Sequence, residues 1–259
     1  MIRCFEERDK QKVIRLWQEA FGESERDILP FLEFINSDML LLEEEGEIIS
    51  MLSLLKVKIG DKDGRYVYAV ATDRRFRGKG YASVLINHAK AVVNKTDGGF
   101  LVILPRNEAL YSFYAKFGFV PLHCAKRISR RISAKNLFET EKITAEEYAE
   151  LKKTYFSGEK YVLWDIKTLR FMKKAYSGEF LKASQKGEVK GFAFCHKMGD
   201  KLMIHELIAT VDAPLITDSF GLFLGAKSAE CIKAERCGES FGMIYPPDNE
   251  FVCFGLGMQ

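Results

Sequence analysis

The sequence predicts a mixed α/β layer fold that is present in two copies. In the first half, two helical patterns are followed by three strand patterns, a glycine-bearing loop, and then alternating helices and strands. Short turn sequences separate the three strands, and such turns join antiparallel neighbours. The second half repeats several of these turns and strands at a nearly constant offset. We therefore expect a mostly antiparallel sheet flanked by helices, followed by a second copy of that unit.

The first elements are two amphipathic helices and a three-stranded meander. Apolar residues recur at helical spacing within residues 9–20 and 25–35. Three strand patterns follow, at residues 39–44, 47–59 and 65–72. The sequences Glu45-Gly46 and Gly60-Asp61-Lys62-Asp63-Gly64 separate them and predict two tight turns.

A basic loop connects the last of these strands to an apolar helix. The segment Ala71 to Ser83 carries Gly78 and Gly80, together with Arg74, Arg75, Arg77 and Lys79. Unpaired backbone amides and the helix dipole favour an anion at a helix N-terminus, and the two glycines leave the backbone open to a ligand. The loop is therefore predicted to bind phosphate.

The remaining elements of the first half follow the loop directly. Residues 85–93 show helical apolar spacing, and Phe100 to Pro105 is an apolar run typical of a buried strand. A further helix is expected from Asn107 to Lys116, ended by Gly118.

The second half matches the first at offsets of 141, 139 and 138 residues, where Gly46, Gly60 and Ala71 correspond to Gly187, Gly199 and Ala209. Strands are expected at residues 190–197 and 201–209. The second copy has no Arg, Lys or Gly-x-Gly in residues 211–220, so we do not expect it to bind phosphate.

The predicted domains are residues 1–130 and 140–259. The charged segment Lys126 to Lys142 is their expected junction, with its basic pairs on a solvated face.

Composition narrows the classes of function. The 259 residues are 47% hydrophobic, which is ample for a core, and the net charge of +3 arises from 39 basic and 36 acidic residues. The basic loop is thus a local feature, and no nucleic acid partner is expected. No apolar signal or spanning segment is visible, which predicts a cytoplasmic protein without membrane contact. Six scattered cysteines without a C-x-x-C pair predict no metal site and no disulfide framework.

Three phosphate-binding patterns compete for the glycine loop. A Walker A sequence is missing, and the Rossmann fingerprint lacks its third small residue and the acidic residue after the next strand. The segment Arg77 to Ala82 matches R/Q-x-x-G-x-G/A, and here the chain resembles the GNAT superfamily of acyl-coenzyme A N-acetyltransferases. A second register, from Arg75 to Gly80, also fits the bare pattern.

A second GNAT signature is similar to Asn107 to Phe119, so the resemblance covers roughly residues 1–130. It implies a GNAT fold, duplicated with a degenerate second copy, like the first two domains of enhanced-intracellular-survival type aminoglycoside acetyltransferases. It also implies acetyl-CoA as the acyl donor and Tyr114 as the general acid for the departing thiolate. The cofactor-binding residues that it implies are Val70, Ala71, Thr72, Arg77, Gly78, Lys79, Gly80, Tyr81, Ala82 and Asn107.

Several alternatives stay open. Tyr114 is either catalytic or a packed aromatic residue, and Arg74 and Arg75 either meet the 3′-phosphate of the cofactor or are solvated. The general base is open among Glu43, Glu44, Glu45, His123 and a water molecule, and the glutamate run is either an acceptor pocket or a solvated strand end.

The resulting hypothesis is a tandem GNAT N-acetyltransferase that transfers an acetyl group to a primary amine of a small molecule in a ternary complex. The second copy would shape the acceptor site. The rivals are a non-catalytic acyl-CoA sensor or scaffold, and an acyltransferase with a longer acyl donor or a protein acceptor. The sequence identifies neither the acceptor nor the oligomeric state.

Overall fold

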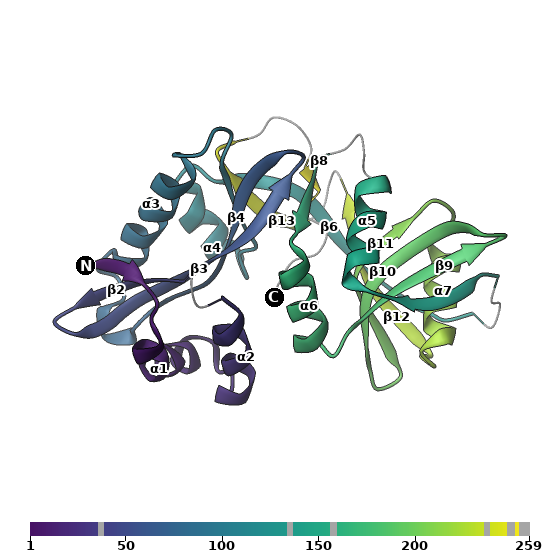
Figure 1. The fold of residues 1–259 in the computed structure, drawn as a ribbon, viewed down its shortest axis with the longest axis horizontal. Helices are drawn as coiled ribbons and strands as arrows, with labels where there is room; N and C mark the ends of the chain where they lie inside the picture. The colour runs from purple at the N-terminus through teal and green to yellow at the C-terminus, as the bar shows by residue number, and fades with distance from the viewer. Residues whose placement is uncertain (36–38, 134–136, 156–159, 236–238, 248–251, 254–259) are drawn as a thin grey trace. The chain divides into compact units, whose positions relative to one another are not determined.

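The computed structural model describes all residues except 36–38, 134–136, 156–159, 236–238, 248–251 and 254–259 (Figure 1). Its contacts divide the chain into two compact units. The first comprises Met1–Val120 together with Gly242–Asn249, and the second comprises Pro121–Phe241 together with Glu250–Gln259. Among the described helices, none combines the length and the apolar character that crossing a membrane requires.

The first unit contains a six-stranded arrangement in the order β1-β2-β3-β4-β5-β13. Its strands are β1 (Ile2–Cys4), β2 (Met39–Glu44), β3 (Glu47–Ile59), β4 (Lys62–Thr72), β5 (Phe100–Ile103) and β13 (Glu239–Tyr245). The first four are antiparallel neighbours, as the short turns predict, whereas β5 runs parallel to β4. The bounds of β2 and β3 agree with the predicted strands.

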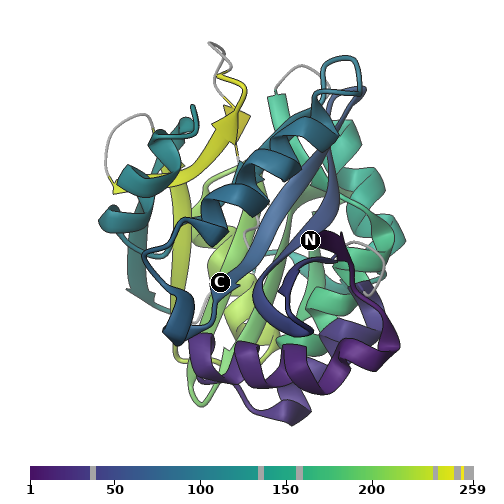
Figure 2. The ribbon, with the colours of Figure 1, turned by 90° about the vertical axis from the view of Figure 1, so that its left-hand side faces the viewer.

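Helices cover both faces of this sheet. They are α1 (Lys10–Phe21), α2 (Glu25–Ile35), α3 (Tyr81–Val93) and α4 (Glu108–Ala115). Leu85 of α3 and Tyr114 of α4 join Leu52 of β3 in one buried cluster. Trp17 of α1 instead packs its ring edge against Tyr68 of β4, at a centroid separation of 6.0 Å. Figure 2 shows α3 lying across the strands of this unit and the two N-terminal helices at its lower end.

The second unit repeats the central part of the first. Its elements are β6 (Val120–Arg131), β7 (Glu139–Ile143), α5 (Ala145–Tyr155), β8 (Lys160–Trp164), α6 (Ile166–Ala175), β9 (Glu179–Gln185), β10 (Glu188–Met198), β11 (Lys201–Ala209), α7 (Ala213–Phe223), β12 (Ser228–Glu235) and β14 (Val252–Cys253). An antiparallel meander β9-β10-β11 leads into α7 and then to β12, which is parallel to β11. The same order and directions occur in β2-β3-β4-α3-β5, so the fold is a duplicated α/β unit.

The units depart from the predicted domain bounds in two segments. Residues 121–130 pack with the second unit, where β6 lies antiparallel to β12. Residues 242–249 return to the first unit, where β13 pairs with β5. The basic pairs expected on a solvated junction therefore belong to a strand, and Arg130 of that strand donates to Asp218, whose side chain is 2% exposed, at 3.0 Å.

The second copy also lacks one helix of the first. Only residues 236–238 separate β12 from β13, whereas α4 occupies half of the corresponding connection between β5 and β6. Within the described residues, the second unit therefore has no helix that corresponds to the one carrying Asn107 and Tyr114.

Candidate functional site

The end of β4 has an open edge toward β5. Strand β5 pairs with β4 only at Gly64, Arg65 and Tyr66, so within the described pairings residues 67–72 have a partner strand on the β3 side alone. A bulge at Ala69, whose φ is +51°, shifts the register of β4 against β3 and increases the local bend. The predicted cofactor strand, Val70 to Thr72, lies in this open part.

The backbone direction of the open edge can be followed residue by residue. The amide of Asp73 donates to the carbonyl oxygen of Ile49 on β3 at 2.8 Å. Because successive residues of a strand turn their peptide groups to opposite sides, Thr72 faces away from β3. Its carbonyl oxygen accepts a hydrogen bond from Nε of Arg77 at 2.9 Å. The strand therefore presents peptide groups on the side where an extended ligand could pair with them.

The glycine loop lies between this strand end and α3. Gly78 and Gly80 have φ values of +78° and +86°, a region that residues with a side chain rarely adopt, and a Cβ at either position would meet no atom within 4 Å. Gly80 is the N-cap of α3, and its carbonyl oxygen accepts from the Val84 amide at 3.1 Å. The amides of the first turn of α3, before Val84, have no acceptor within the helix and point out of its end, as at every helix start. The loop is thus an open, glycine-lined helix N-terminus.

Carboxylates already contact several of the basic residues that the sequence places in this loop. Asp73 accepts from the Arg75 amide at 2.8 Å and from its guanidinium, and the guanidinium also reaches Glu47 at 2.9 Å. These hydrogen bonds hold the pKa of Asp73 below its ordinary value. Arg77 lies 3.7 Å from Glu19. Much of the positive charge expected from the sequence is therefore paired.

Two further loop residues make contacts of their own. The ammonium group of Lys79 lies 5.1 Å from the centre of the Phe76 ring. The hydroxyl of Tyr81 donates to Glu44 at 2.9 Å, and this bond raises the pKa of the phenol. Ala82 follows in the first turn of α3. The structure thus brings the predicted residues Arg77 to Ala82 together at the start of one helix.

Tyr114 is buried in the core of the first unit. Its side chain is 4% exposed and packs edge to face on Phe113 and Phe119, with centroid separations of 5.1 and 5.8 Å. Burial raises the pKa of its phenol above the ordinary value, so the hydroxyl keeps its proton at neutral pH. Tyr114 is therefore a packed aromatic residue, and its hydroxyl is at the same time a protonated donor.

Asn107 caps the helix that carries Tyr114. Its side-chain oxygen accepts from the Leu110 amide at 3.0 Å, in the standard manner of an N-cap residue. The predicted contact of Asn107 with a cofactor is thus left to its side-chain NH₂ group and its backbone.

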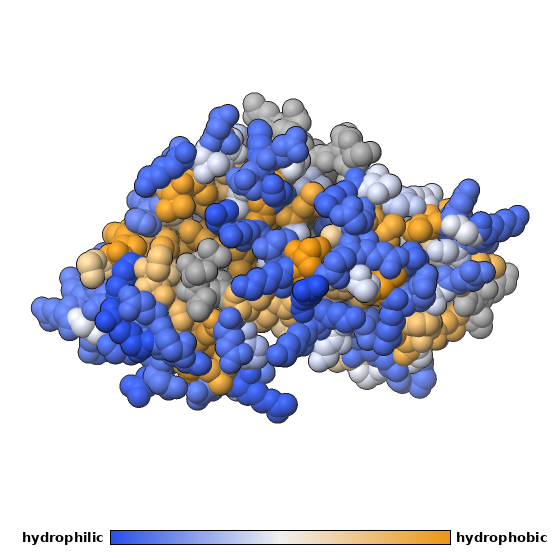
Figure 3. Space-filling view, viewed as in Figure 1, coloured by the Kyte–Doolittle hydropathy of each residue, from blue (hydrophilic) through white to orange (hydrophobic). Residues whose placement is uncertain are grey.

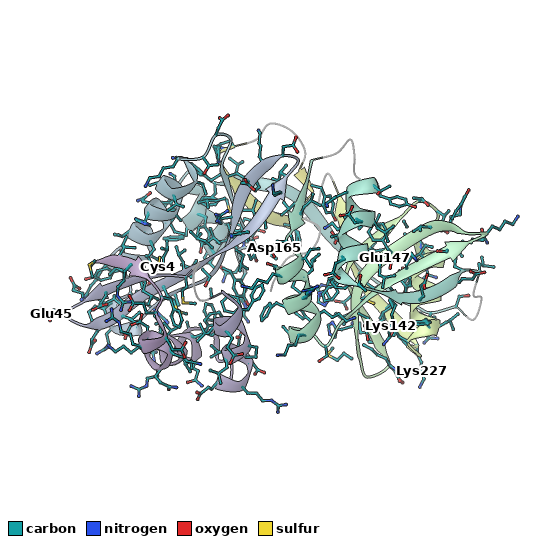
Figure 4. All side chains as sticks on the ribbon, in the orientation of Figure 1. Cys4, Glu45, Lys142, Glu147, Asp165 and Lys227 are labelled. Carbon is teal, nitrogen blue, oxygen red and sulfur yellow. The ribbon has the colours of Figure 1, made fainter. Side chains whose placement is uncertain are left out.

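The candidate bases do not gather at one point. Glu43 binds Arg3, and Glu44 binds Tyr81, while Glu45 lies at the tip of the β2–β3 hairpin (Figure 4). The surface of this tip is hydrophilic (Figure 3). The side chain of His123 lies outside the described residues. The glutamate run is therefore a strand end with separate partners and forms no shared pocket.

The second unit differs at the equivalent helix. Asp212 is the N-cap of α7, and a proline occupies the first turn. A carboxylate at that position opposes a bound phosphate, which agrees with the loss of the glycine loop there.

Two features of the structure carry no signal in the sequence. Glu19 and Glu47, which contact the loop, come from α1 and β3, and nothing in their local sequence indicates that role. In the second unit, Glu206 is buried and accepts hydrogen bonds from Tyr148, Tyr161 and Lys152. Only the fold brings these groups together.

Comparisons with known proteins agree with this arrangement. Residues 6–119 match the family model described as "Acetyltransferase (GNAT) family". A search of the curated proteins gives no match.

Solved structures share the fold over nearly the whole chain at low identity. A GCN5-related N-acetyltransferase from Anabaena variabilis is 14% identical, with 94% of this chain and 72% of that chain covered and a TM-score of 0.74. Eis1 from Mycobacterium abscessus is 10% identical, with 93% and 73% covered and a TM-score of 0.60. N-myristoyltransferase from Saccharomyces cerevisiae, solved with bound myristoyl-CoA, is 10% identical, with 100% and 89% covered and a TM-score of 0.61.

The sheet with its open strand edge, the glycine loop at the start of α3 and the family match all concern the same residues of the first unit. Residues 6–119 thus match the model of the acetyltransferase (GNAT) family, and the chain shares its overall fold with solved N-acetyltransferases and with Eis1.

Proposed function

We propose that the protein transfers an acetyl group from acetyl-CoA to a primary amine of a small molecule, by direct attack within a ternary complex in the cytoplasm. The observation that carries this proposal is the continuous path from the open edge of β4 to the glycine loop at the start of α3. An extended pantetheine chain can hydrogen-bond to the strand edge, and a pyrophosphate can meet the helix amides.

The reaction requires two contributions from the chain, an oxyanion contact and a proton donor. The amine nitrogen attacks the thioester carbonyl carbon, and the oxyanion that forms would accept hydrogen bonds from backbone amides within Val70 to Thr72. The carbon–sulfur bond then breaks, and the thiolate takes the proton of the Tyr114 hydroxyl. Burial keeps that proton in place before the reaction, since it raises the pKa of the phenol. Water removes the proton that the attacking nitrogen loses.

The experiment compares Tyr114→Phe with the matched variant Tyr111→Phe. Both residues lie on α4, and the hydroxyl of Tyr111 accepts from the Gly242 amide at 3.0 Å. Tyr114→Phe should lower kcat by roughly 10²- to 10⁴-fold and leave the affinity for acetyl-CoA nearly unchanged. Tyr111→Phe should leave kcat within a few-fold of wild type. Equal rates for the wild type and Tyr114→Phe would assign Tyr114 to packing alone.

The acyl donor can be tested without knowledge of the acceptor. At a hundredfold excess over its dissociation constant, acetyl-CoA should stabilise the fold by about 2.7 kcal/mol, visible as a thermal shift. Myristoyl-CoA should be tested beside it, because one similar structure contains that donor. A shift with the long donor alone would replace acetyl by a longer acyl group, and no shift with either donor would remove the assignment.

A second candidate is an acyl-CoA sensor without turnover. It is favoured by the tyrosines Tyr66 and Tyr68 on β4 and by the engagement of Glu43 and Glu44 with other side chains, which leaves no evident base among the described residues. Release of free thiol from acetyl-CoA across aminoglycosides, polyamines, amino acids and peptides distinguishes the two. Release that depends on one of these amines identifies the acceptor class, and binding without release supports the sensor.

A further inference from the structure

The arginine expected to hold the ligand's pyrophosphate is already bound within the chain. Nε of Arg77 donates to the carbonyl oxygen of Thr72 at 2.9 Å, and a terminal guanidinium nitrogen lies 3.7 Å from Oε1 of Glu19. Glu19 is in the last turn of α1 and is distant from the loop in sequence. The same Oε1 atom accepts from the Arg74 amide at 2.9 Å. One carboxylate oxygen thus contacts both a backbone amide and a guanidinium of the loop.

We propose that Glu19 is a positioning residue that contacts the donors of the loop in place of the ligand's anion and gives up Arg77 when a phosphate binds. This inference rests on the proposed function. A phosphate oxygen recognises the same pair of donors, a backbone amide and an arginine, that Glu19 contacts. Binding is then an exchange, in which Arg77 leaves the carboxylate for the pyrophosphate while the Arg74 amide keeps Glu19 as its acceptor.

Arg77 can exchange its carboxylate partner more easily than Arg75 can. Its contact with Glu19 is long at 3.7 Å, and the two side chains are 50% and 40% exposed. Arg75 is held instead by Asp73 at 2.8 Å and by Glu47 at 2.9 Å. Two short contacts, one from a residue only two positions away, are harder to replace than one long contact. An arriving anion therefore recruits Arg77 and leaves Arg75 in place.

The test removes the charge of Glu19 and keeps its hydrogen-bond acceptor. Glu19→Gln retains Oε1 for the Arg74 amide but no longer attracts Arg77, so the Kd for acetyl-CoA in the full-length protein should fall about two- to fivefold at low salt. The difference should shrink at about 1 M salt, where screening is strong. Glu19→Ala also loses the acceptor, and its Kd should lie above that of Glu19→Gln.

Two controls separate the exchange from a general effect of charge. Glu47→Gln removes the same charge beside the loop, but Arg75 keeps Asp73, so its Kd should stay close to that of wild type. In an Arg77→Gln background, Glu19→Gln should have no further effect, because the exchanged cation is gone. Isothermal titration calorimetry on these variants gives each Kd directly.

The outcomes are distinguishable. A Kd for Glu19→Gln that equals or exceeds the wild-type value refutes the exchange, as does an equal gain in Glu47→Gln or a gain that persists without Arg77. In each of these cases the wild type still binds acetyl-CoA, and the proposed function stands. A wild-type protein that does not bind acetyl-CoA refutes the proposed function and the exchange with it.

Discussion

Acid should destabilise the second unit through a pair of histidines. Nδ1 of His196 on β10 and Nε2 of His205 on β11 lie 2.8 Å apart. At that distance one ring donates its proton and the other accepts it, so at least one ring must be neutral. Burial lowers the pKa of both rings, and the charge of His196 adds to the effect on His205, whose pKa falls to about 4.

The size of the effect follows from the pKa of His205. Its pKa drops from 6.5 to about 4 on folding, and one pKa unit corresponds to about 1.36 kcal/mol, so neutral His205 contributes about 3 kcal/mol of stability. Because the folded pKa is the lower one, the unfolded chain takes up the proton first as the pH falls. The contribution is fully present above pH 6.5, declines below it and is gone below about pH 4.

The assay is urea unfolding of wild type and His205→Phe at several pH values between about 7 and 4. A phenylalanine ring suits this position, since Tyr176 and Phe194 pack against the histidine at centroid separations of 4.8 and 5.2 Å. The free energy of unfolding of wild type should fall by about 3 kcal/mol more than that of the variant over this range. Carboxylates titrate in both proteins, so their contribution to the pH dependence of the unfolding free energy cancels in the comparison. Parallel pH profiles would refute the reasoning.

Three further changes have defined outcomes. Glu206→Gln leaves the ammonium group of Lys152, which is 2% exposed, without its carboxylate and should cost about 3–5 kcal/mol in chemical denaturation; a loss below about 1 kcal/mol would contradict this. Gly80→Val forces a β-branched residue to a φ of +86° and should weaken acetyl-CoA binding by about tenfold or more, whereas Gly46→Val, with a φ of +79° on the hairpin, should leave binding intact. Met243→Ala removes a side chain that is 1% exposed and should cost about 2–5 kcal/mol, with acetyl-CoA binding weakened at temperatures where the first unit begins to unfold. Unchanged stability of this last variant would show that β13 is dispensable for the first unit.

The fold was predictable where local signals decide it. The turn at Glu45 and Gly46 lies between β2 and β3, whose bounds match the predicted ones, and α2 coincides with the predicted helix at residues 25–35. The charged segment predicted as a solvated junction does carry exposed side chains, Arg127 among them, but that it forms the strand β6 was not predicted. Arg127 pairs with Glu230 and Arg130 pairs with Asp218, which lie about a hundred residues away, and no local pattern reveals partners so distant.

In the candidate site, too, the features with local signals were predictable and those that depend on distant residues were not. The glycines and the helix start are local properties, so the sequence located the loop and its open backbone. The electrostatic state of the loop is not local, because Glu19 and Glu47 reach it from other elements and pair with its arginines. Counting the arginines of the segment therefore overstates the positive charge available to a ligand.

Strand β13 determines when the first unit can mature. Met243, Ile244 and Tyr245 pair with β5, and the Tyr245 ring lies under the ammonium group of Lys90 on α3, 4.3 Å from it. A ribosome makes these residues only after β6 to β12 of the second unit. The first unit, although its first residues appear first, therefore stays one strand short while the second unit is being made, and its sheet closes only after β13 has followed β12.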